Sequence, residues 1–229
     1  MLFPSLTQGR ILKRYKRFFA DIELEDGSIV VAHCANTGSM KTCWEPGWPA
    51  LISPATNPER KLRWTLEFTL PPNHFIMVNT ALTNHLVKEA LSELAPFKDY
   101  LTILPEQKIF DSRFDFLLTQ SGLPDFWVEV KNVTLLDSPG VASFPDAVST
   151  RGQKHLQDLI KLKESGQRAA MLYVLSRSDA EKFKTADKID LDYAQALKLA
   201  VSKGVEVYCF GLEKKGDEYK LAKSIEVLV

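Results

Sequence analysis

FWVEVKN, residues 126–132, has the composition of a buried β-strand, yet it carries a carboxylate and an ammonium group. Its aromatic and β-branched residues suit a pleated, half-covered surface. Because successive side chains of a strand point to opposite faces, Val128 and Val130 share one face, and Glu129 and Lys131 share the other. The stretch therefore predicts a strand with one apolar face and one face that holds two opposite charges.

The segment RFDFLLT, residues 113–119, is the expected partner of this strand, because the turn QSGLPD lies between the two. A turn centred on Gly122 predicts an antiparallel pair of strands. One face of the pair is then apolar, with Phe114 opposite Val130, Phe116 opposite Val128, and Leu118 opposite Phe126. The other face places Asp115 opposite Glu129, Arg113 opposite Lys131, and Leu117 opposite Trp127.

The facing carboxylates of Asp115 and Glu129 require a compensating charge, since like charges directly opposite each other destabilise a sheet. A hard divalent cation such as Mg²⁺ or Mn²⁺ binds carboxylates together with water and substrate phosphate. Lys131, one strand repeat beyond Glu129, is placed to assist a water or to neutralise charge on a phosphate. We predict that Asp115, Glu129 and Lys131 are catalytic and that Asp115 and Glu129 bind the metal. The alternative is a solvated sheet face with cross-strand ion pairs.

The overall composition limits the class of protein. The 229 residues are 45% hydrophobic, and 29 Lys and Arg balance 29 Asp and Glu. This net charge of zero excludes nucleic-acid binding through overall charge, but a local basic surface can still contact phosphates. No stretch approaches the roughly 20 apolar residues of a membrane helix, and the N-terminus lacks the pattern of a secretory signal. Three widely spaced cysteines form no CxxC pair, so we predict a cytoplasmic protein that does not act at a membrane.

The first 80 residues have the pattern of an all-β domain. Asp26-Gly27 is a hairpin signal between FFADIEL and SIVVAHC. The strand-like segments also include GRILKRY, residues 49–52, residues 63–70 and residues 75–78. Five short strands separated by loops rich in Pro, Gly and Asn predict a small OB-like barrel over residues 1–80, with a β-sandwich as the alternative.

Residues 81–229 alternate between helical and strand patterns, which predicts an α/β sheet domain. TNHLVKEALSEL is expected to form the first helix, with Thr83 as its N-cap. Two further helices are expected to end at Gly166 and Gly204. The segment 134–150 has no helical or strand period and is predicted to be a long binding loop.

Two basic segments predict contacts with DNA. The first contains Arg10, Lys13, Arg14, Lys16 and Arg17, with Tyr15, Phe18 and Phe19 as aromatic platforms. The second contains Arg151, Lys154 and His155, which share one face at a helix N-terminus, where free N–H groups favour phosphate. The alternatives are a solvated charged face for the first segment, and ion pairing of Arg151 with packing of His155 for the second.

The spacing Asp-x13-Glu-x-Lys on two adjacent strands, with a helix before and after, resembles the PD-(D/E)xK nuclease core. In that group the first acidic residue and the Glu bind metal, and the Lys assists the attacking water. The resemblance gives these roles to Asp115, Glu129 and Lys131. Phe114 stands where the group has its proline.

The whole chain resembles the sugar fermentation stimulation protein A (SfsA) family. The matching stretches are NTGSM (36–40), SRFDF (112–116), VEVKNVTL (128–135), FPDAVSTRGQKHL (144–156), and ID followed by GVEVY near the end. The resemblance implies an OB-like domain followed by a restriction-endonuclease-like mixed-sheet domain, DNA binding, and a link to the regulation of sugar (maltose) use.

Three functions follow from these observations. The first is a DNA-binding protein with a metal-dependent nuclease fold that hydrolyses phosphodiesters. The second is a catalytically inactive DNA-binding regulator. The third is a metal-dependent enzyme acting on a small phosphorylated compound, or a protein-interaction module. The sequence carries no signal for an oligomeric state.

Overall fold

The first six strands form a closed barrel in the computed structural model, which describes residues 1–3, 5–57 and 59–228. The strand order is β3-β2-β1-β4-β5-β6, and a parallel pairing of β3 with β5 closes the barrel. The bounds are β1 Thr7–Tyr15, β2 Phe19–Leu24, β3 Ile29–His33, β4 Pro49–Pro54, β5 Trp64–Thr69 and β6 Ile76–Met77. The OB-like barrel predicted from the strand pattern is confirmed.

Two glycines explain local features of the barrel. Gly27, in the hairpin between β2 and β3, has φ +80° and therefore adopts a conformation that side chains disfavour. At Gly9 in β1, an added Cβ would lie 2.7 Å from the carbonyl oxygen of Glu23 on β2. These positions need glycine because the chain turns tightly at one and approaches a neighbouring strand closely at the other.

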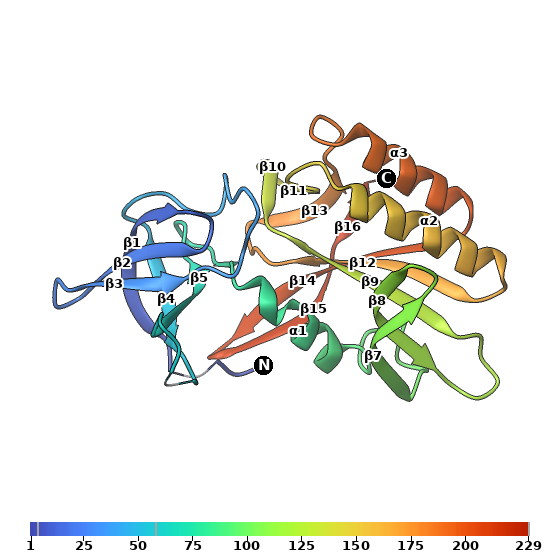
Figure 1. Ribbon diagram of the computed structural model, residues 1–229, viewed down its shortest axis with the longest axis horizontal. Helices are drawn as coiled ribbons and strands as arrows, with labels where there is room; N and C mark the ends of the chain where they lie inside the picture. The colour runs from blue at the N-terminus through green and yellow to red at the C-terminus, as the bar shows by residue number, and fades with distance from the viewer. Residues whose placement is uncertain (4, 58, 229) are drawn as a thin grey trace.

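The second domain is built on a six-stranded mixed sheet with the order β15-β14-β12-β9-β8-β7. Its strands are β7 Thr102–Ile109, β8 Ser112–Thr119, β9 Phe126–Val133, β12 Arg168–Leu175, β14 Glu206–Lys215 and β15 Glu218–Ser224. The strand β12 runs parallel to both β9 and β14. Helix α2 (Thr150–Glu164) lies between β9 and β12 in the chain, and α3 (Leu191–Ser202) precedes β14 (Figure 1).

Helices cover both faces of this sheet. Leu86 and Val87 of α1 (Thr83–Ala90) pack in one core with Val128 and Val130 of β9. The opposite face packs against α2 and α3, in a core whose members include Leu156, Leu159, Tyr173, Tyr193 and Leu197. The predicted α/β arrangement is thereby confirmed, and β9 runs through its centre.

The structure corrects three expectations. Thr83 is the first residue of α1 and not its N-cap, because a short 3₁₀ helix, η1 (Thr80–Leu82), leads directly into it. The predicted loop 134–150 contains two strands, β10 (Leu135–Ser138) and β11 (Gly140–Phe144). These strands join β13 (Ala180–Thr185) and β16 (Glu226–Leu228) in a separate four-stranded sheet.

The third correction concerns the register of β8 and β9. The predicted register holds for three pairs, Leu118–Phe126, Leu117–Trp127 and Phe116–Val128. The ladder ends after the pair Phe116–Val128. Beyond this point Phe114 does not lie over Val130. It packs against Trp127 and His155 on the opposite side of the sheet, because β8 turns away from β9 at Asp115.

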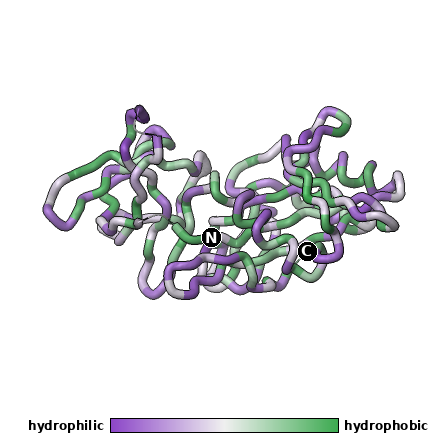
Figure 2. Tube along the Cα trace, turned by 90° about the horizontal axis from the view of Figure 1, so that it is seen from below, coloured by the Kyte–Doolittle hydropathy of each residue, from purple (hydrophilic) through white to green (hydrophobic). Residues whose placement is uncertain are grey.

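The barrel and the sheet domain are joined by backbone and core contacts. The N–H of Met77 in β6 donates to the carbonyl of Ser176, directly after β12. Phe68 and Met77 of the barrel belong to the same apolar core as α1. Seen from below, the barrel forms a lobe beside the larger domain, and hydrophobic and hydrophilic stretches alternate along the chain in both (Figure 2). Within the described residues, none of the helices has the length and apolar character needed to cross a membrane.

Candidate active site

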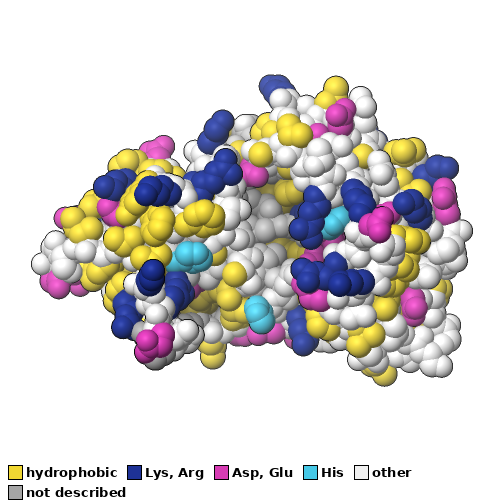
Figure 3. Space-filling view, in the orientation of Figure 1, with side chains coloured by type: hydrophobic (Ala, Val, Ile, Leu, Met, Phe, Trp, Pro, Cys, Tyr) yellow, Lys and Arg dark blue, Asp and Glu magenta, His cyan; other side chains and the backbone are white. Residues whose placement is uncertain are grey.

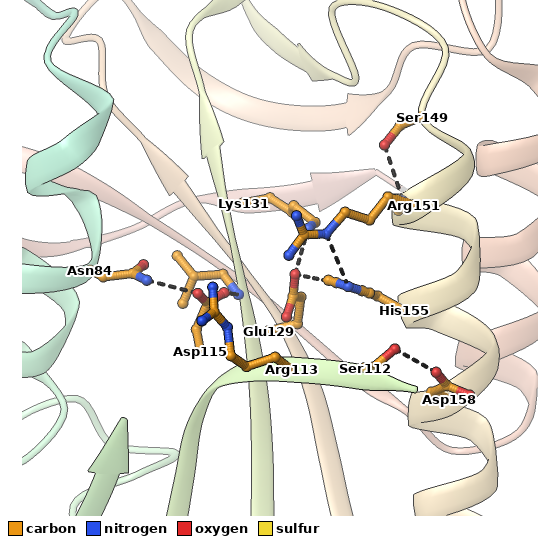
Figure 4. Close-up of polar contacts among 12 residues, drawn as sticks. Asn84, Ser112, Arg113, Asp115, Glu129, Lys131, Ser149, Arg151, His155 and Asp158 are labelled. Carbon is orange, nitrogen blue, oxygen red and sulfur yellow. Dashed lines mark hydrogen bonds and ion pairs between the residues drawn. The ribbon is translucent and has the colours of Figure 1, made fainter. Parts of the chain in front are cut away.

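Asp115 lies where β8 separates from β9, and its carboxylate bonds to the neighbouring strand. The Oδ2 atom accepts a hydrogen bond from the backbone N–H of Val130 at 2.8 Å, and Oδ1 accepts from Nδ2 of Asn84 at 2.7 Å (Figure 4). The carboxylate thus continues the contact between the strands where backbone pairing stops. The side chain of Asp115 is fixed from β9 on one side and from α1 on the other.

Glu129, in the centre of β9, is 3% exposed. Its Oε1 atom accepts hydrogen bonds from Nζ of Lys131 at 2.5 Å and from Nδ1 of His155. The Nε2 atom of His155 accepts from Nε of Arg151 at 3.4 Å, which assigns the ring proton to Nδ1. The second oxygen of Glu129, Oε2, is buried and has no hydrogen-bond partner among the described residues.

The two carboxylates have opposite pKa shifts. Burial and then the charge of Glu129 raise the pKa of Asp115 above its usual value. Burial also opposes ionisation of Glu129, but the hydrogen bond from His155 and the charge of Lys131 outweigh it, so the pKa of Glu129 is lowered. Glu129 is therefore held as the anion, and its charge acts on Asp115.

The residues present fit a hard divalent cation. An unpaired buried carboxylate oxygen is costly without a partner, and Oε2 of Glu129 is such an atom. No group of three or more His, Cys, Asp and Glu side chains suited to a metal gathers anywhere in the described part of the chain. Two carboxylates suffice for Mg²⁺, which keeps several waters and binds through one or two carboxylates plus substrate phosphate.

The N-terminus of α2 borders this pair of carboxylates. Ser149 caps the helix, with its side chain accepting from the N–H of Gly152 at 3.1 Å. Arg151 and Lys154 are exposed, whereas His155 is buried beneath them. All three line a cavity of about 370 Å³ to which Lys108 and Arg113 also contribute. The space-filling view shows Lys and Arg side chains gathered beside a hollow between the two domains (Figure 3).

The five cations of the first basic segment have different surroundings in the barrel. Nη2 of Arg14 donates to the carbonyls of Arg17, Asn36 and Gly38, so this side chain ties loops together. Lys13 pairs with Asp21, and Nη1 of Arg10 donates to the carbonyl of Gly47. Lys16 and Arg17 are exposed in the turn between β1 and β2.

The aromatic residues beside these cations include a stacked pair. The rings of Tyr15 and Phe19 are 5.4 Å apart at 17°, and Nζ of Lys13 lies 5.3 Å from the centre of the Tyr15 ring. Phe18 is exposed. The surface therefore places aromatic rings beside the exposed cations Lys16 and Arg17.

Sequence reasoning missed the residues that orient the site. Asn84 holds Asp115 from α1, 31 residues earlier in the chain, and Lys108 approaches α2 from the edge strand β7. Neither residue belongs to a recognisable motif. The spacing of Arg151 and His155 predicts that they share one face of the helix, but it does not indicate that His155 bonds to Glu129.

Comparisons with known proteins give one consistent result. The family model of the sugar fermentation stimulation protein RE domain matches residues 81–218, and that of the SfsA N-terminal OB domain matches residues 12–78. The sugar fermentation stimulation protein homolog of Rhodospirillum rubrum is 45% identical over 227 residues and covers 93% of each chain. The homolog of Syntrophotalea carbinolica is 47% identical over 213 residues, covering 92% of this chain and 91% of its own.

A solved structure also matches over the whole length. The structure of Pyrococcus furiosus SfsA in complex with Ca²⁺ has a TM-score of 0.89 and 27% sequence identity, and covers 100% of this chain and 98% of that one. The family resemblance seen in the sequence motifs is therefore confirmed. The chain belongs to the sugar fermentation stimulation protein (SfsA) family.

Proposed function

We propose that this chain binds DNA and hydrolyses phosphodiesters with the help of a divalent cation, Mg²⁺ or Mn²⁺, held by Asp115 and Glu129. The observation that carries the proposal is the buried, unpartnered Oε2 atom of Glu129 beside a second carboxylate. The Ca²⁺ complex of Pyrococcus furiosus SfsA supports it, because that relative binds a hard, oxygen-seeking cation.

The residues of the chain would divide the chemistry as follows. A bound cation supplies charge neutralisation at the phosphate and lowers the pKa of water. Asn84 and the N–H of Val130 orient Asp115, and His155 orients Glu129. The ammonium group of Lys131 stands beside Glu129, where it can orient a water or stabilise charge on the phosphate.

The cavity at the start of α2 would hold the neighbouring phosphates. Arg151, Lys154, Lys108 and Arg113 border it, and a helix N-terminus adds its own attraction for anions. Arg113 also pairs with Glu106 at 2.6 Å on the exposed surface. Because such surface pairs contribute little energy, a phosphate can compete for the guanidinium group.

Cleavage and metal binding can be tested together. Purified protein is incubated with single- and double-stranded DNA in Mg²⁺ or Mn²⁺, and melting temperatures are measured with and without Ca²⁺. We expect cleavage by the wild type and a Ca²⁺-dependent rise in its melting temperature. Glu129→Gln should lose both, because it removes an anionic ligand at Oε2.

The matched control is Glu181→Gln, which neutralises an exposed carboxylate on β13 that pairs with Lys223. This variant should keep both properties. Cleavage that is equally fast in Glu129→Gln would contradict the assignment of the site, and so would an unchanged response to Ca²⁺.

One observation favours a second candidate, a DNA-binding regulator without catalysis. Glu129 already has a compensating cation in the protein, since Nζ of Lys131 lies 2.5 Å from Oε1. This candidate is favoured if the wild type binds DNA in a salt-sensitive manner, cleaves none of the substrates, and binds equally well after Glu129→Gln.

A further inference from the structure

A small polar cavity of about 190 Å³ lies between the barrel and the sheet domain. The barrel contributes the loop Asn36–Gly38, part of the NTGSM motif that the proposed site does not use. The sheet domain contributes Asn132 and Thr134 at the end of β9, and the segment from Ser143 to Asp146. Asn132 directly follows Lys131 on β9 and points to the opposite face, so the cavity lies at the end of the strand that carries the proposed active site.

The cavity is bounded by a fixed contact between the two domains. Oδ2 of Asp146 accepts from the backbone N–H of Ser39 at 2.8 Å and from its hydroxyl at 3.3 Å. An added Cβ on Gly38 would lie 2.2 Å from the same Oδ2 atom. Gly38 therefore allows the barrel loop to approach Asp146, and this approach closes one side of the cavity.

Two polar groups of the cavity have unused hydrogen-bonding capacity. Ser143, 1% exposed, has a buried hydroxyl with no partner in the described part of the chain. Oδ1 of Asn132 accepts from the hydroxyls of Thr83 and Ser176, which fixes the amide orientation. No described residue accepts from its Nδ2 group, so the amide N–H groups remain for a ligand. An unpartnered buried hydroxyl is costly, and a bound polar ligand would remove that cost.

The chemistry of the lining excludes a phosphate and favours a neutral, planar ligand. No Lys or Arg lines the cavity, and Asp146 brings a carboxylate. An exocyclic amino group can donate to a carboxylate, while ring nitrogens and carbonyls accept from amide and hydroxyl groups. The ring of Phe144 and the side chain of Leu135 supply apolar walls. At about 190 Å³ the cavity is smaller than the roughly 300–1,000 Å³ of drug-sized pockets, so it has room for one ring system.

We propose that this cavity receives a single unpaired nucleobase of the DNA whose backbone lies across Asp115 and Glu129. The inference rests on the proposed function. A base is favoured over a free sugar because the cavity lies near the residues proposed to hold the DNA phosphates. Glu129 and Asn132 are about 10 Å apart along β9, with side chains on opposite faces. Phe144 of the cavity packs in the core on the α2 side of the sheet, the side on which Glu129 contacts His155. A base in the cavity therefore belongs to a nucleotide close to the phosphate at the carboxylates. Such a base must come from a single strand or be displaced from a duplex, at an energetic cost that is smallest at a mismatch.

The test compares three labelled oligonucleotides of one sequence in Ca²⁺ buffer: single-stranded, duplex with one central mismatch, and fully matched duplex. Gels confirm that each remains intact. We expect the wild type to bind the first two about 30- to 100-fold more tightly than the matched duplex, the factor that corresponds to a displacement cost of about 2–3 kcal/mol. Affinity for the matched duplex should depend only on the Lys and Arg side chains that contact its phosphates.

Two variants probe the cavity itself. Thr37→Trp places a large ring at the exposed rim and should abolish the preference while leaving matched-duplex affinity unchanged. Ser143→Ala should weaken binding of the single strand about three- to ten-fold, the effect of one hydrogen bond. Its melting temperature should equal or exceed that of the wild type, because the substitution removes an unpartnered buried hydroxyl. The controls are Ser121→Trp and Ser138→Ala, at exposed positions outside the cavity.

The outcomes separate this inference from the proposed function. If the wild type binds none of the three oligonucleotides, both are refuted. Binding of all three with equal affinity, or a preference that survives Thr37→Trp and Ser143→Ala, refutes the base site alone. A monosaccharide that raises the melting temperature of the wild type but not of Ser143→Ala would also overturn the base site and identify a sugar as the ligand.

Discussion

Two buried glutamates, Glu67 in the barrel and Glu129 in the sheet domain, have different surroundings and opposite pKa shifts. Glu129 contacts Lys131 and His155, and its pKa is lowered. Glu67 is 5% exposed and accepts hydrogen bonds from Ser53 and from Asn79. Burial raises the pKa of Glu67 despite these bonds. Only one of the two is therefore stabilised as an anion by its surroundings, and that residue lies in the proposed active site.

The raised pKa of Glu67 predicts a pH-dependent loss of stability. The folded state favours the protonated carboxyl, so stability is highest below the ordinary pKa of glutamate and falls as pH rises toward the folded pKa. Glu67→Gln can keep both hydrogen bonds, accepting from Asn79 and donating to Ser53, and carries no charge. We expect this variant to unfold at higher denaturant concentration than the wild type at pH 7, and the difference to shrink near pH 4.

Urea titrations at several pH values measure this difference. Glu25→Gln, at an exposed position of the same domain, is the control and should follow the wild type throughout. A Glu67→Gln variant that is less stable than the wild type at pH 7, with the deficit vanishing at low pH, would show that the ionised carboxylate stabilises the barrel.

Helices α2 and α3 begin at a shared carboxylate. Asp190 caps α3 by accepting from the N–H of Tyr193 at 2.9 Å, and its Oδ2 accepts from the N–H of Ser149 at 2.7 Å. Ser149 in turn caps α2, the helix that carries Arg151 and His155. The starts of both helices are thus held by one buried side chain, which is 4% exposed.

This arrangement predicts unequal costs for two cap substitutions. Ser149→Ala removes one cap and should lower the free energy of unfolding by about 1 kcal/mol. Asp190→Ala leaves the N–H groups of Tyr193 and Ser149 without this partner and should cost about 2–4 kcal/mol. Chemical denaturation of the two variants checks the ranking. Equal losses would show that the link between the helices contributes nothing beyond a single cap.

The elements also show what sequence patterns can and cannot predict here. Strands β8, β9 and β12 and helices α2 and α3 follow from apolar periodicity and from Gly166 and Gly204, which adopt positive φ where the helices end. The pairing of β10 and β11 could not be predicted, because β11 is completed by parallel pairing with β13, about 40 residues later. The same limit applies at the site: β8 and β9 placed Asp115 near Glu129, but the bond of Asn84 to Asp115 depends on tertiary packing.

The two domains are tied at several places around the proposed site. Arg177, 3% exposed, pairs with Asp179 of the sheet domain, and its Nη1 donates to the hydroxyl of Thr42 in the barrel at 3.1 Å. Asp146, which also belongs to the sheet domain, accepts from the backbone N–H of Ser39 in the barrel. These contacts fix the barrel against β9. Under the proposed function, one DNA strand would contact Lys16 and Arg17 in the barrel and Lys154 on α2.

A strand that spans both domains should show a defined salt dependence, although the net charge of the chain is zero. Each phosphate contact to single-stranded DNA contributes a slope of about −0.7 to the plot of log K against log salt concentration. Lys16→Ala and Lys154→Ala should each make the slope shallower by about 0.7, and the double variant by about 1.4, because the contacts are independent. Lys220→Ala, at a β15 cation that pairs with Glu93, should leave the slope unchanged. Fluorescence anisotropy at a series of salt concentrations measures these slopes. If Lys16→Ala keeps the slope of the wild type and Lys154→Ala makes it shallower, the DNA contacts the sheet domain alone.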